Sequence, residues 1–236
     1  MKKFIISLFL ISGIAVSLHA QTLLPAEQDT YKDLPAFRIA INGGGGYRLG
    51  RLPDGIDAPT RDYLSALKWG FSYGAEATYF FGETMGIGVK YHNFHASNKA
   101  EGTLTLNDGT VRTGTMSDNQ AFSFLGPIIS YRAVDSDARN AFYMTMGGGY
   151  MTYKNDGRLI DPVVMKGNTL GAVFELGYDY GLSEHLYFGA TLSLFSGKLS
   201  RYSCTQNGST SEVRLDKDHQ ESMSHVDLTI GLRYYL

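Results

Sequence analysis

The sequence contains a single cysteine, Cys204, among 236 residues, and only six prolines and one tryptophan. One cysteine excludes an intramolecular disulfide, so hydrogen-bonded strands and packing must hold the fold together. The charges nearly balance, with 21 Lys and Arg against 23 Asp and Glu, so nothing indicates a nucleic-acid partner. Glycine and aromatic residues are abundant, with 28 Gly, 16 Tyr and 13 Phe, which favours a secreted β protein of one domain.

The apolar run at the N-terminus, residues 4–16, is shorter than the roughly 20 residues that a membrane-spanning helix needs. Lys2 and Lys3 precede this run, and a short polar exit follows it, which predicts a secretory signal peptide over residues 1–20. Gln21 follows the predicted cleavage site, where a lipoprotein would carry a cysteine. We therefore expect a secreted chain with neither a helical anchor nor an attached lipid.

Alternation of apolar and polar residues dominates the rest of the chain. Residues 21–36 carry charges and two prolines without a sustained period, and we expect a periplasmic lead-in there. Eight later segments alternate with the period of a β-strand, and each is long enough to cross a bilayer at a tilt. The predicted strands are residues 37–49, 68–81, 85–96, 120–132, 141–154, 170–182, 186–198 and 223–236.

The last predicted strand alternates without a break to the final residue. Its apolar face consists of Val226, Leu228, Ile230, Leu232, Tyr234 and Leu236. An alternating strand with aromatic residues at its end resembles the closing strand and assembly signal of Gram-negative outer-membrane β-barrels. The resemblance implies that this apolar face contacts lipid.

The connections between the predicted strands alternate strictly between short and long. The short ones are residues 82–84, 133–140 and 183–185, and the long ones are 50–67, 97–119, 155–169 and 199–222. Asp108 and Gly109 predict a hairpin turn within the second long connection. The pattern predicts an all-β fold, an eight-stranded antiparallel up-and-down transmembrane β-barrel over residues 37–236, with both termini in the periplasm.

One strand departs from the simple alternation. Phe122 and Phe124 share the parity of Arg132, although aromatic residues are expected to face lipid and the arginine to face the lumen. We expect Pro127 to mark a β-bulge that shifts the register, so that the aromatics and the arginine lie on opposite faces.

The alternation directs four cations and four anions into the lumen. The interior of an eight-stranded barrel is only wide enough for its own side chains, so unpaired charges there would be costly. We therefore predict a structural, mutually hydrogen-bonded network, with a narrow ion pathway as the alternative. The predicted network consists of Arg38, Glu76, Lys90, Arg132, Glu175, Asp179, Asp227 and Arg233.

Over residues 37–236, this pattern resembles the small eight-stranded outer-membrane barrel families of the OmpX, OmpA transmembrane-domain and OmpW kind. Members of those families act variously as adhesion or envelope-integrity proteins, narrow pores and accessory subunits, so the resemblance implies a fold rather than one function. We expect a non-enzymatic protein of the outer membrane with a structural, adhesion or partner-binding role through its extracellular loops. Its expected partners are outer-membrane lipid and, through the outer loops, an envelope protein.

A short element after the third predicted strand indicates an enzymatic alternative. His-Ala-Ser-Asn at residues 95–98 resembles the His-x-Ser-Asn element of outer-membrane lipid A 3-O-deacylases, in which a histidine activates a serine. His95 and Ser97 would share one strand face. Glu101 or Asp118 would then orient the histidine as the third member of a triad.

No metal site and no cofactor are predicted. The last long loop gathers acidic residues and a histidine, but their parity divides them between two strand faces, and the glycine of a calcium loop is missing. These loop residues are Asp216, Asp218, His219 and Glu221. His92, at a lumen position, and His225, at the outer end of the last strand, have no sequence neighbours at metal-binding spacing. We expect both imidazoles to be packed or hydrogen-bonded.

Overall fold

The computed structural model describes residues 35–53, 55–105, 111–159, 161–216 and 220–236. The predicted signal peptide, nearly all of the predicted lead-in, the predicted turn at Asp108–Gly109 and residues 217–219 lie outside the described residues. No helix in the described ranges has the length and the apolar composition needed to cross a membrane.

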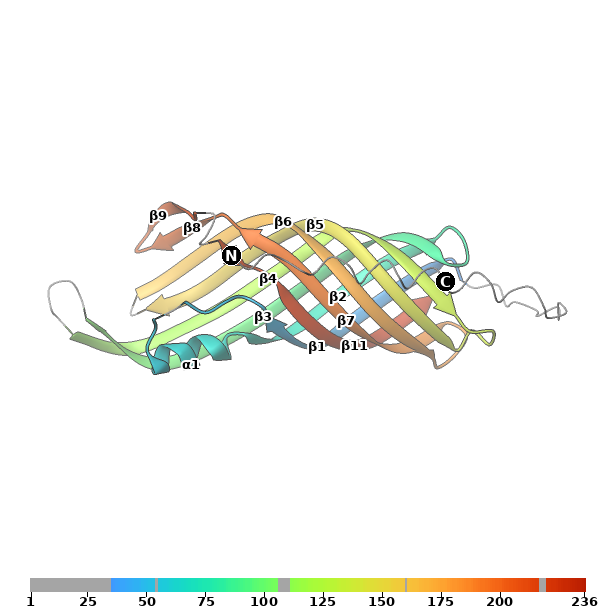
Figure 1. Ribbon diagram of the computed structural model, residues 1–236, viewed down its shortest axis with the longest axis horizontal. Helices are drawn as coiled ribbons and strands as arrows, with labels where there is room; N and C mark the ends of the chain where they lie inside the picture. The colour runs from blue at the N-terminus through green and yellow to red at the C-terminus, as the bar shows by residue number, and fades with distance from the viewer. Residues whose placement is uncertain (1–34, 54, 106–110, 160, 217–219) are drawn as a thin grey trace, which may run out of the picture. The chain divides into compact units, whose positions relative to one another are not determined.

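Eight antiparallel strands form a closed ring (Figure 1), which confirms the predicted fold class. Each strand is hydrogen-bonded to its neighbour along the chain, and β11 closes the ring by pairing with both β7 and β1. The ring strands are β1 (Phe37–Arg48), β2 (Trp69–Phe80), β3 (Met85–Thr105), β4 (Val111–Val134), β5 (Asn140–Leu159), β6 (Asp161–Gly181), β7 (Leu186–Leu199) and β11 (His225–Tyr235).

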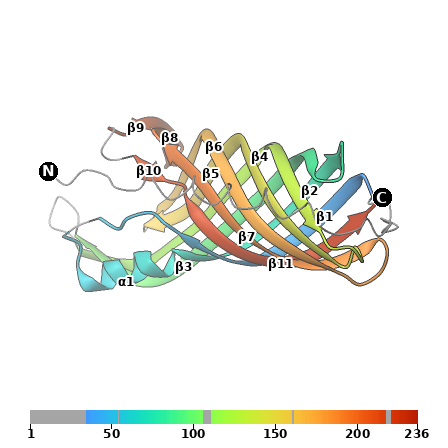
Figure 2. The same cartoon turned by 45° about the vertical axis from the view of Figure 1, so that its right-hand side comes forward.

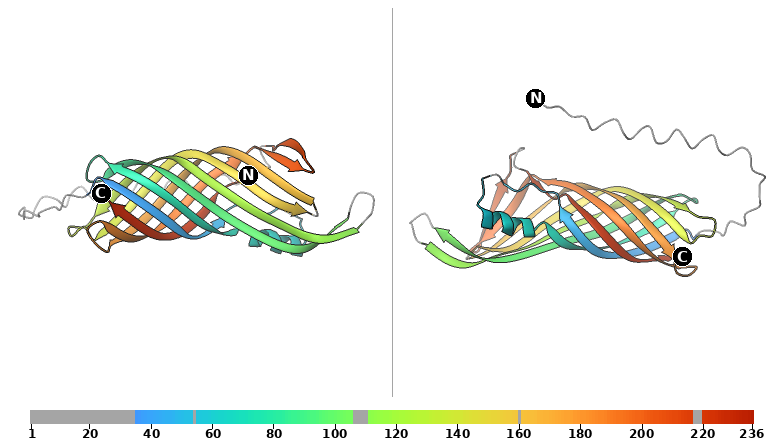
Figure 3. Two further views of the ribbon diagram at one scale, coloured as in Figure 1. Left: turned by 180° about the vertical axis from the view of Figure 1, so that it is seen from behind. Right: turned by 60° about the horizontal axis from the view of Figure 1, so that its bottom comes forward.

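The strands β3 to β6 extend well beyond the predicted segments. Pairing of β3 with β4 continues to Thr105 opposite Val111, and pairing of β5 with β6 continues to Leu159 opposite Asp161. Figure 3 shows β3 and β4 running together past the ends of the other strands. The alternation of apolar residues ends where the lipid ends, but ladder hydrogen bonds between strands do not require lipid. Two predicted long loops are therefore largely paired ribbon.

The other two long connections also contain regular structure. The first forms the helix α1 (Ala58–Ala66), with a proline in its first turn, where the fixed φ of proline suits a helix start. The last forms β8 (Arg201–Gln206), β9 (Ser209–Arg214) and β10 (Glu221–Ser222). Asn207 and Gly208, with φ of 50° and 77°, make the tight turn between β8 and β9. Strand β8 pairs with β6 and β10 with β7 (Figure 2).

The outward face of the ring is an apolar belt, as the alternation predicts. In β11 and the residue that follows it, the exposed residues are Leu228, Ile230, Leu232, Tyr234 and Leu236. Exposed aromatic residues lie at the strand ends beside the short turns, among them Phe81, Tyr131, Phe142, Tyr180 and Phe188. Aromatic rings at the end of an apolar band are typical of the headgroup level of a membrane.

The predicted β-bulge at Pro127 is wrong. Strands β3 and β4 keep one register along their whole length, and β4 has the same register against β5 on both sides of Pro127. Phe122 and Phe124 therefore point into the lumen together with Arg132, and all three are buried. Proline has no N–H to donate, but it adopts the extended backbone of a strand, so it interrupts the ladder without adding a residue to it.

Candidate functional site in the barrel lumen

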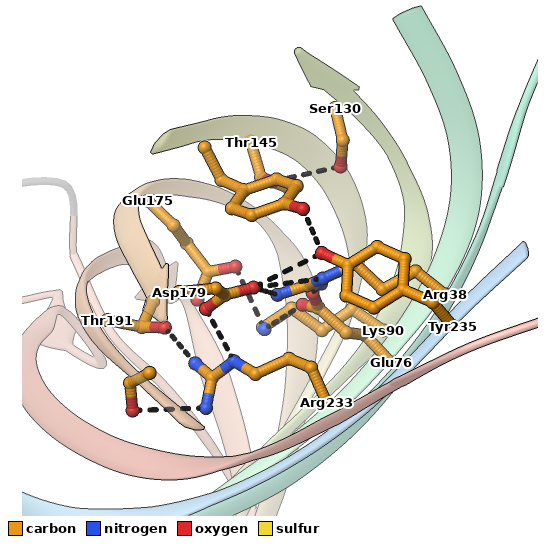
Figure 4. Close-up of polar contacts among 12 residues, drawn as sticks. Arg38, Glu76, Lys90, Ser130, Thr145, Glu175, Asp179, Thr191, Arg233 and Tyr235 are labelled. Carbon is orange, nitrogen blue, oxygen red and sulfur yellow. Dashed lines mark hydrogen bonds and ion pairs between the residues drawn. The ribbon is translucent and has the colours of Figure 1, made fainter. Parts of the chain in front are cut away.

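Six of the eight predicted lumen charges form one connected network (Figure 4). Three cations and three anions, from β1, β2, β3, β6 and β11, contribute to it, so the network is neutral as a whole. All six are buried among the inward side chains: Arg38, Glu76, Lys90, Glu175, Asp179 and Arg233.

Lys90 joins the two glutamates of the network. Its Nζ lies 2.7 Å from Glu76 Oε2 and 2.8 Å from Glu175 Oε2, which come from opposite sides of the barrel. Glu76 also accepts a hydrogen bond from Arg38, whereas Glu175 otherwise accepts one from the hydroxyl of Ser193. Lys90 is thus the only cation that contacts Glu175 within the described residues.

Asp179 joins the two arginines of the network. One of its oxygens lies 2.9 Å from Arg38 Nη2 and the other lies 2.7 Å from Arg233 Nε. Tyr235 donates a longer hydrogen bond of 3.4 Å to the same carboxylate. Arg233 also donates to the hydroxyl of Thr191 at 2.8 Å. Ion-paired groups of both signs fill the lumen at this level, so each buried charge of the network lies beside an opposite one.

The structure separates Arg132 from these charges, contrary to the prediction. Arg132 Nε donates to the carbonyl oxygen of Glu83 at 2.8 Å, and Nη1 donates to that of Pro35 at 2.9 Å. Its guanidinium stacks 3.9 Å from the centre of the Phe80 ring. Arg132 lies near the end of β4, beside the short connections, so backbone carbonyls are closer to it than the carboxylates.

Asp227 is also separate from the network. Its Oδ2 lies 2.9 Å from Nε2 of His92 and 3.4 Å from Nε2 of His225. Both imidazoles are packed against Phe195, as expected, but the structure also gives them an acidic partner that no sequence neighbour supplies. His92 belongs to β3 whereas Asp227 and His225 belong to β11, and two strands separate them in the ring. Spacing along the chain does not show this convergence across the lumen.

An apolar cluster fills the lumen around and beyond the histidines. It includes Phe94, Phe122, Phe124, Met151, Val173, Phe195, Leu199 and Met223, all nearly inaccessible to solvent. Arg48 stacks 4.7 Å above the Phe122 ring and donates to Gln120 at 2.8 Å and to Glu221 at 2.7 Å. Beside Arg48, between the barrel and the segment that leads into α1, lies a hollow of about 250 Å³.

Helix α1 is fixed to the β3–β4 ribbon by polar side chains. The Tyr63 hydroxyl donates to Asp118 Oδ2 at 2.7 Å, and Asn98 Nδ2 donates to the Tyr63 carbonyl at 2.9 Å. Asn155 of β5 donates to the other oxygen of Asp118. Burial, together with the hydrogen bond to Asp118, raises the pKa of the Tyr63 hydroxyl, so it remains a donor at physiological pH. Asp118 therefore connects α1, β4 and β5.

The residues of the predicted triad do not come together. His95 and Ser97 lie on the outward face of β3, with Phe71 and Ala121 opposite His95 on the neighbouring strands. Asp118 lies on the inward face and binds Tyr63 and Asn155. Glu101 accepts a hydrogen bond from Thr115, six residues along the strand from His95, which is about 20 Å away. Neither carboxylate is placed to orient His95.

Comparison with known proteins supports the architecture. No protein-family model and no curated protein matches the sequence. Neisserial surface protein A superposes with a TM-score of 0.53 at 13% identity, covering 87% of this chain and all of that one. OprG of Pseudomonas aeruginosa superposes with a TM-score of 0.52 at 17% identity, covering 86% of this chain and 97% of that one. A major outer membrane protein of Thermus thermophilus superposes with a TM-score of 0.54 at 14% identity, covering 85% of this chain and 100% of that one.

At these identities the likeness establishes the fold alone. The chain has the architecture of a small eight-stranded outer-membrane β-barrel, and its exposed apolar belt requires a bilayer around it. It is therefore an outer-membrane protein, as the sequence predicts, and the signal peptide stays a prediction.

Proposed function

We propose that the chain is a non-enzymatic outer-membrane protein that binds an envelope protein through its extracellular face. Outer-membrane lipid surrounds the apolar belt, and the barrel serves as a rigid support. The observation that carries the proposal is the extension of β3 to β6 beyond the belt, with α1 fixed beside them.

The filled lumen favours this proposal over a narrow pore. The charged network occupies one level of the barrel, and the apolar cluster of aromatic, methionine and aliphatic side chains occupies the next. Arg48 with its hydrogen-bonded partners covers the cluster on the extracellular side. A solute would have to displace buried ion pairs and packed rings, which an eight-stranded barrel has little room to allow.

The extracellular segments are conformationally restricted before any partner binds. A free loop loses conformational entropy when it binds, whereas a paired ribbon has already lost it. Strands β3 and β4 are paired to their ends, β5 and β6 likewise, and Asp118 links these ribbons to α1. Exposed charged residues such as Arg61 of α1 and Lys99 of β3 offer polar contacts to a protein.

Crosslinking in living cells tests the proposal. A photoreactive residue in place of Lys99 or Arg61 is expected to give a discrete protein adduct, because both positions are exposed on the extracellular face. The same residue in place of Ile129, which is exposed on the lipid-facing belt, is the matched control and is expected to give no protein adduct. Denaturing gels and mass spectrometry identify the adducts.

The substitution Asp118→Ala sharpens this experiment. It removes the acceptor of the Tyr63 hydroxyl and should loosen α1 without touching the belt, so the adduct from Arg61 should weaken. A folded barrel that gives no protein adduct from either extracellular position would contradict the proposal.

The deacylase alternative makes a separate prediction about Ser97. A serine nucleophile needs its hydroxyl, so Ser97→Ala would abolish deacylation and leave the fold intact. Because neither Glu101 nor Asp118 is placed to orient His95, we expect Ser97→Ala to leave the lipid A mass profile and the heat-modifiable gel mobility unchanged. Loss of a lipid A acyl chain in cells with the wild type, reversed by Ser97→Ala, would instead establish the enzyme.

A further inference from the structure

The cluster of His92, His225 and Asp227 is the least satisfied group of polar atoms in the lumen. Each of the three side chains can direct one ligand atom to a common point, and these atoms lie within 4.8 Å of one another. All three residues are at most 3% exposed. Within the described residues, neither oxygen of Asp227 and neither Nε2 atom has a partner with hydrogen-bond geometry.

The charge of Asp227 is not balanced by a lysine or arginine beside it among the described residues. The network below Asp227 is neutral by itself. A buried carboxylate without a counter-charge is costly, so a positive species is expected at this point.

The orientation of His225 indicates which species fits. Its Nδ1 lies 2.9 Å from the carbonyl oxygen of Met223, which can only accept, so Nδ1 carries the hydrogen. In the neutral ring, Nε2 then presents a lone pair toward Asp227. A main-chain carbonyl that fixes the tautomer of an imidazole in this way is the usual outer partner of a metal-binding histidine.

A single proton would satisfy only one of the two imidazoles. Nε2 of His92 and Nε2 of His225 both face the same oxygen of Asp227, at 2.9 Å and 3.4 Å. A metal ion accepts a lone pair from all three groups at once. Ligand atoms around a tetrahedral zinc ion lie about 3.3 Å apart, so small side-chain movements would complete the geometry.

The surrounding wall leaves room for this convergence. Gly46 of β1 and Gly74 of β2 lie between the strands that carry the ligands, and a Cβ at Gly46 would collide with Asp227 and with the Phe94 ring. The Phe195 ring stacks against both imidazoles, 4.2 Å from His92 and 4.7 Å from His225 between ring centres. An apolar shell of this kind excludes water and strengthens metal–ligand bonds.

We propose that His92, His225 and Asp227 bind a divalent transition-metal ion of the zinc type inside the barrel. Two imidazole nitrogens and one carboxylate favour such an ion over calcium or magnesium, which prefer oxygen ligands. The ion balances Asp227 and links β3 to β11 across the lumen. Because the site is closed on all sides by packed side chains, the ion enters while the barrel folds. The inference does not depend on the proposed function.

Metal loading during refolding tests this site. The full chain, purified without a histidine tag, is unfolded in denaturant with a chelator and refolded in detergent with Co²⁺, a spectroscopic substitute for Zn²⁺. We expect about one Co²⁺ per folded chain, with the visible absorption of a site of low coordination number, and displacement of Co²⁺ when Zn²⁺ is present during refolding. Elemental analysis after gel filtration gives the stoichiometry.

Matched variants assign the ion to this cluster. His92→Phe keeps a ring against Phe195 and Asp227→Asn keeps the size of the side chain, and each is expected to lose the bound ion and the absorption. His95→Phe changes a neighbouring histidine on the outward face and is expected to retain both. Heat-modifiable gel mobility identifies the folded fraction of every variant.

The outcomes separate clearly. A folded wild type that takes up neither Co²⁺ nor Zn²⁺ overturns the inference whatever the variants do. Equal metal content in the folded wild type and in folded His92→Phe or Asp227→Asn also overturns it, because the ion would then be bound elsewhere.

Discussion

Replacing Lys90 with methionine is expected to destabilise the folded barrel by roughly 3–5 kcal/mol, the usual result of removing one partner from a buried ion pair. Lys90 is 2% exposed and bridges Glu76 and Glu175. After the substitution Glu76 retains Arg38, but Glu175 retains, among the described residues, only the Ser193 hydroxyl. Urea unfolding of the barrel in lipid vesicles, followed by tryptophan fluorescence and gel mobility, measures the loss.

Two controls show whether the charge is the cause. Lys154→Met breaks the exposed pair with Asp156 and should change the stability by about 1 kcal/mol or less. Combining Lys90→Met with Glu175→Gln restores the charge balance and should recover part of the loss, because removing both members of a buried pair is often nearly neutral. Unchanged stability of Lys90→Met would show that the network is not needed for folding.

The sequence predicts on which face of a strand a side chain lies far better than it predicts which side chains that residue contacts. Alternation correctly places Glu76, Lys90 and Asp179 in the lumen, because a strand directs successive side chains to opposite faces whatever its neighbours are. The belt that includes Leu228 and Ile230 follows from the same rule. The closed ring follows from the alternating short and long connections.

Which inward residues share a level of the barrel depends on strand tilt and stagger, and parity does not give these. Arg132 is inward as predicted, yet its level places it against the carbonyls of Pro35 and Glu83 instead of the carboxylates. His92 and Asp227 lie on strands that are far apart in the sequence, yet they meet. The expected register shift at Pro127 rests on assigning aromatic residues to lipid, although rings such as Phe122 also fill the lumen.

Glycines determine how closely β1 and β11 approach at the seam where the ring closes. In a narrow barrel, inward Cβ atoms of adjacent strands converge on one another. Gly44 of β1 faces inward opposite Thr229, and a Cβ there would lie 2.7 Å from the Thr229 Cα. That obstacle is backbone, which cannot rotate away. Gly45, the next residue, faces outward, and a Cβ there would have nothing within 4 Å.

Gly44→Val is therefore expected to destabilise the barrel by more than about 3 kcal/mol, beyond the usual range for overpacking, because the two strands must separate to admit the side chain. Since β1 and β11 close the ring, we expect most of the protein to remain unfolded, without the gel shift of a folded barrel. Gly45→Val is the matched control, in the same strand and with the same side chain. It should fold normally, because valine favours strands and here faces lipid. Equal folded fractions of the two variants would show that the seam does not require glycine at Gly44.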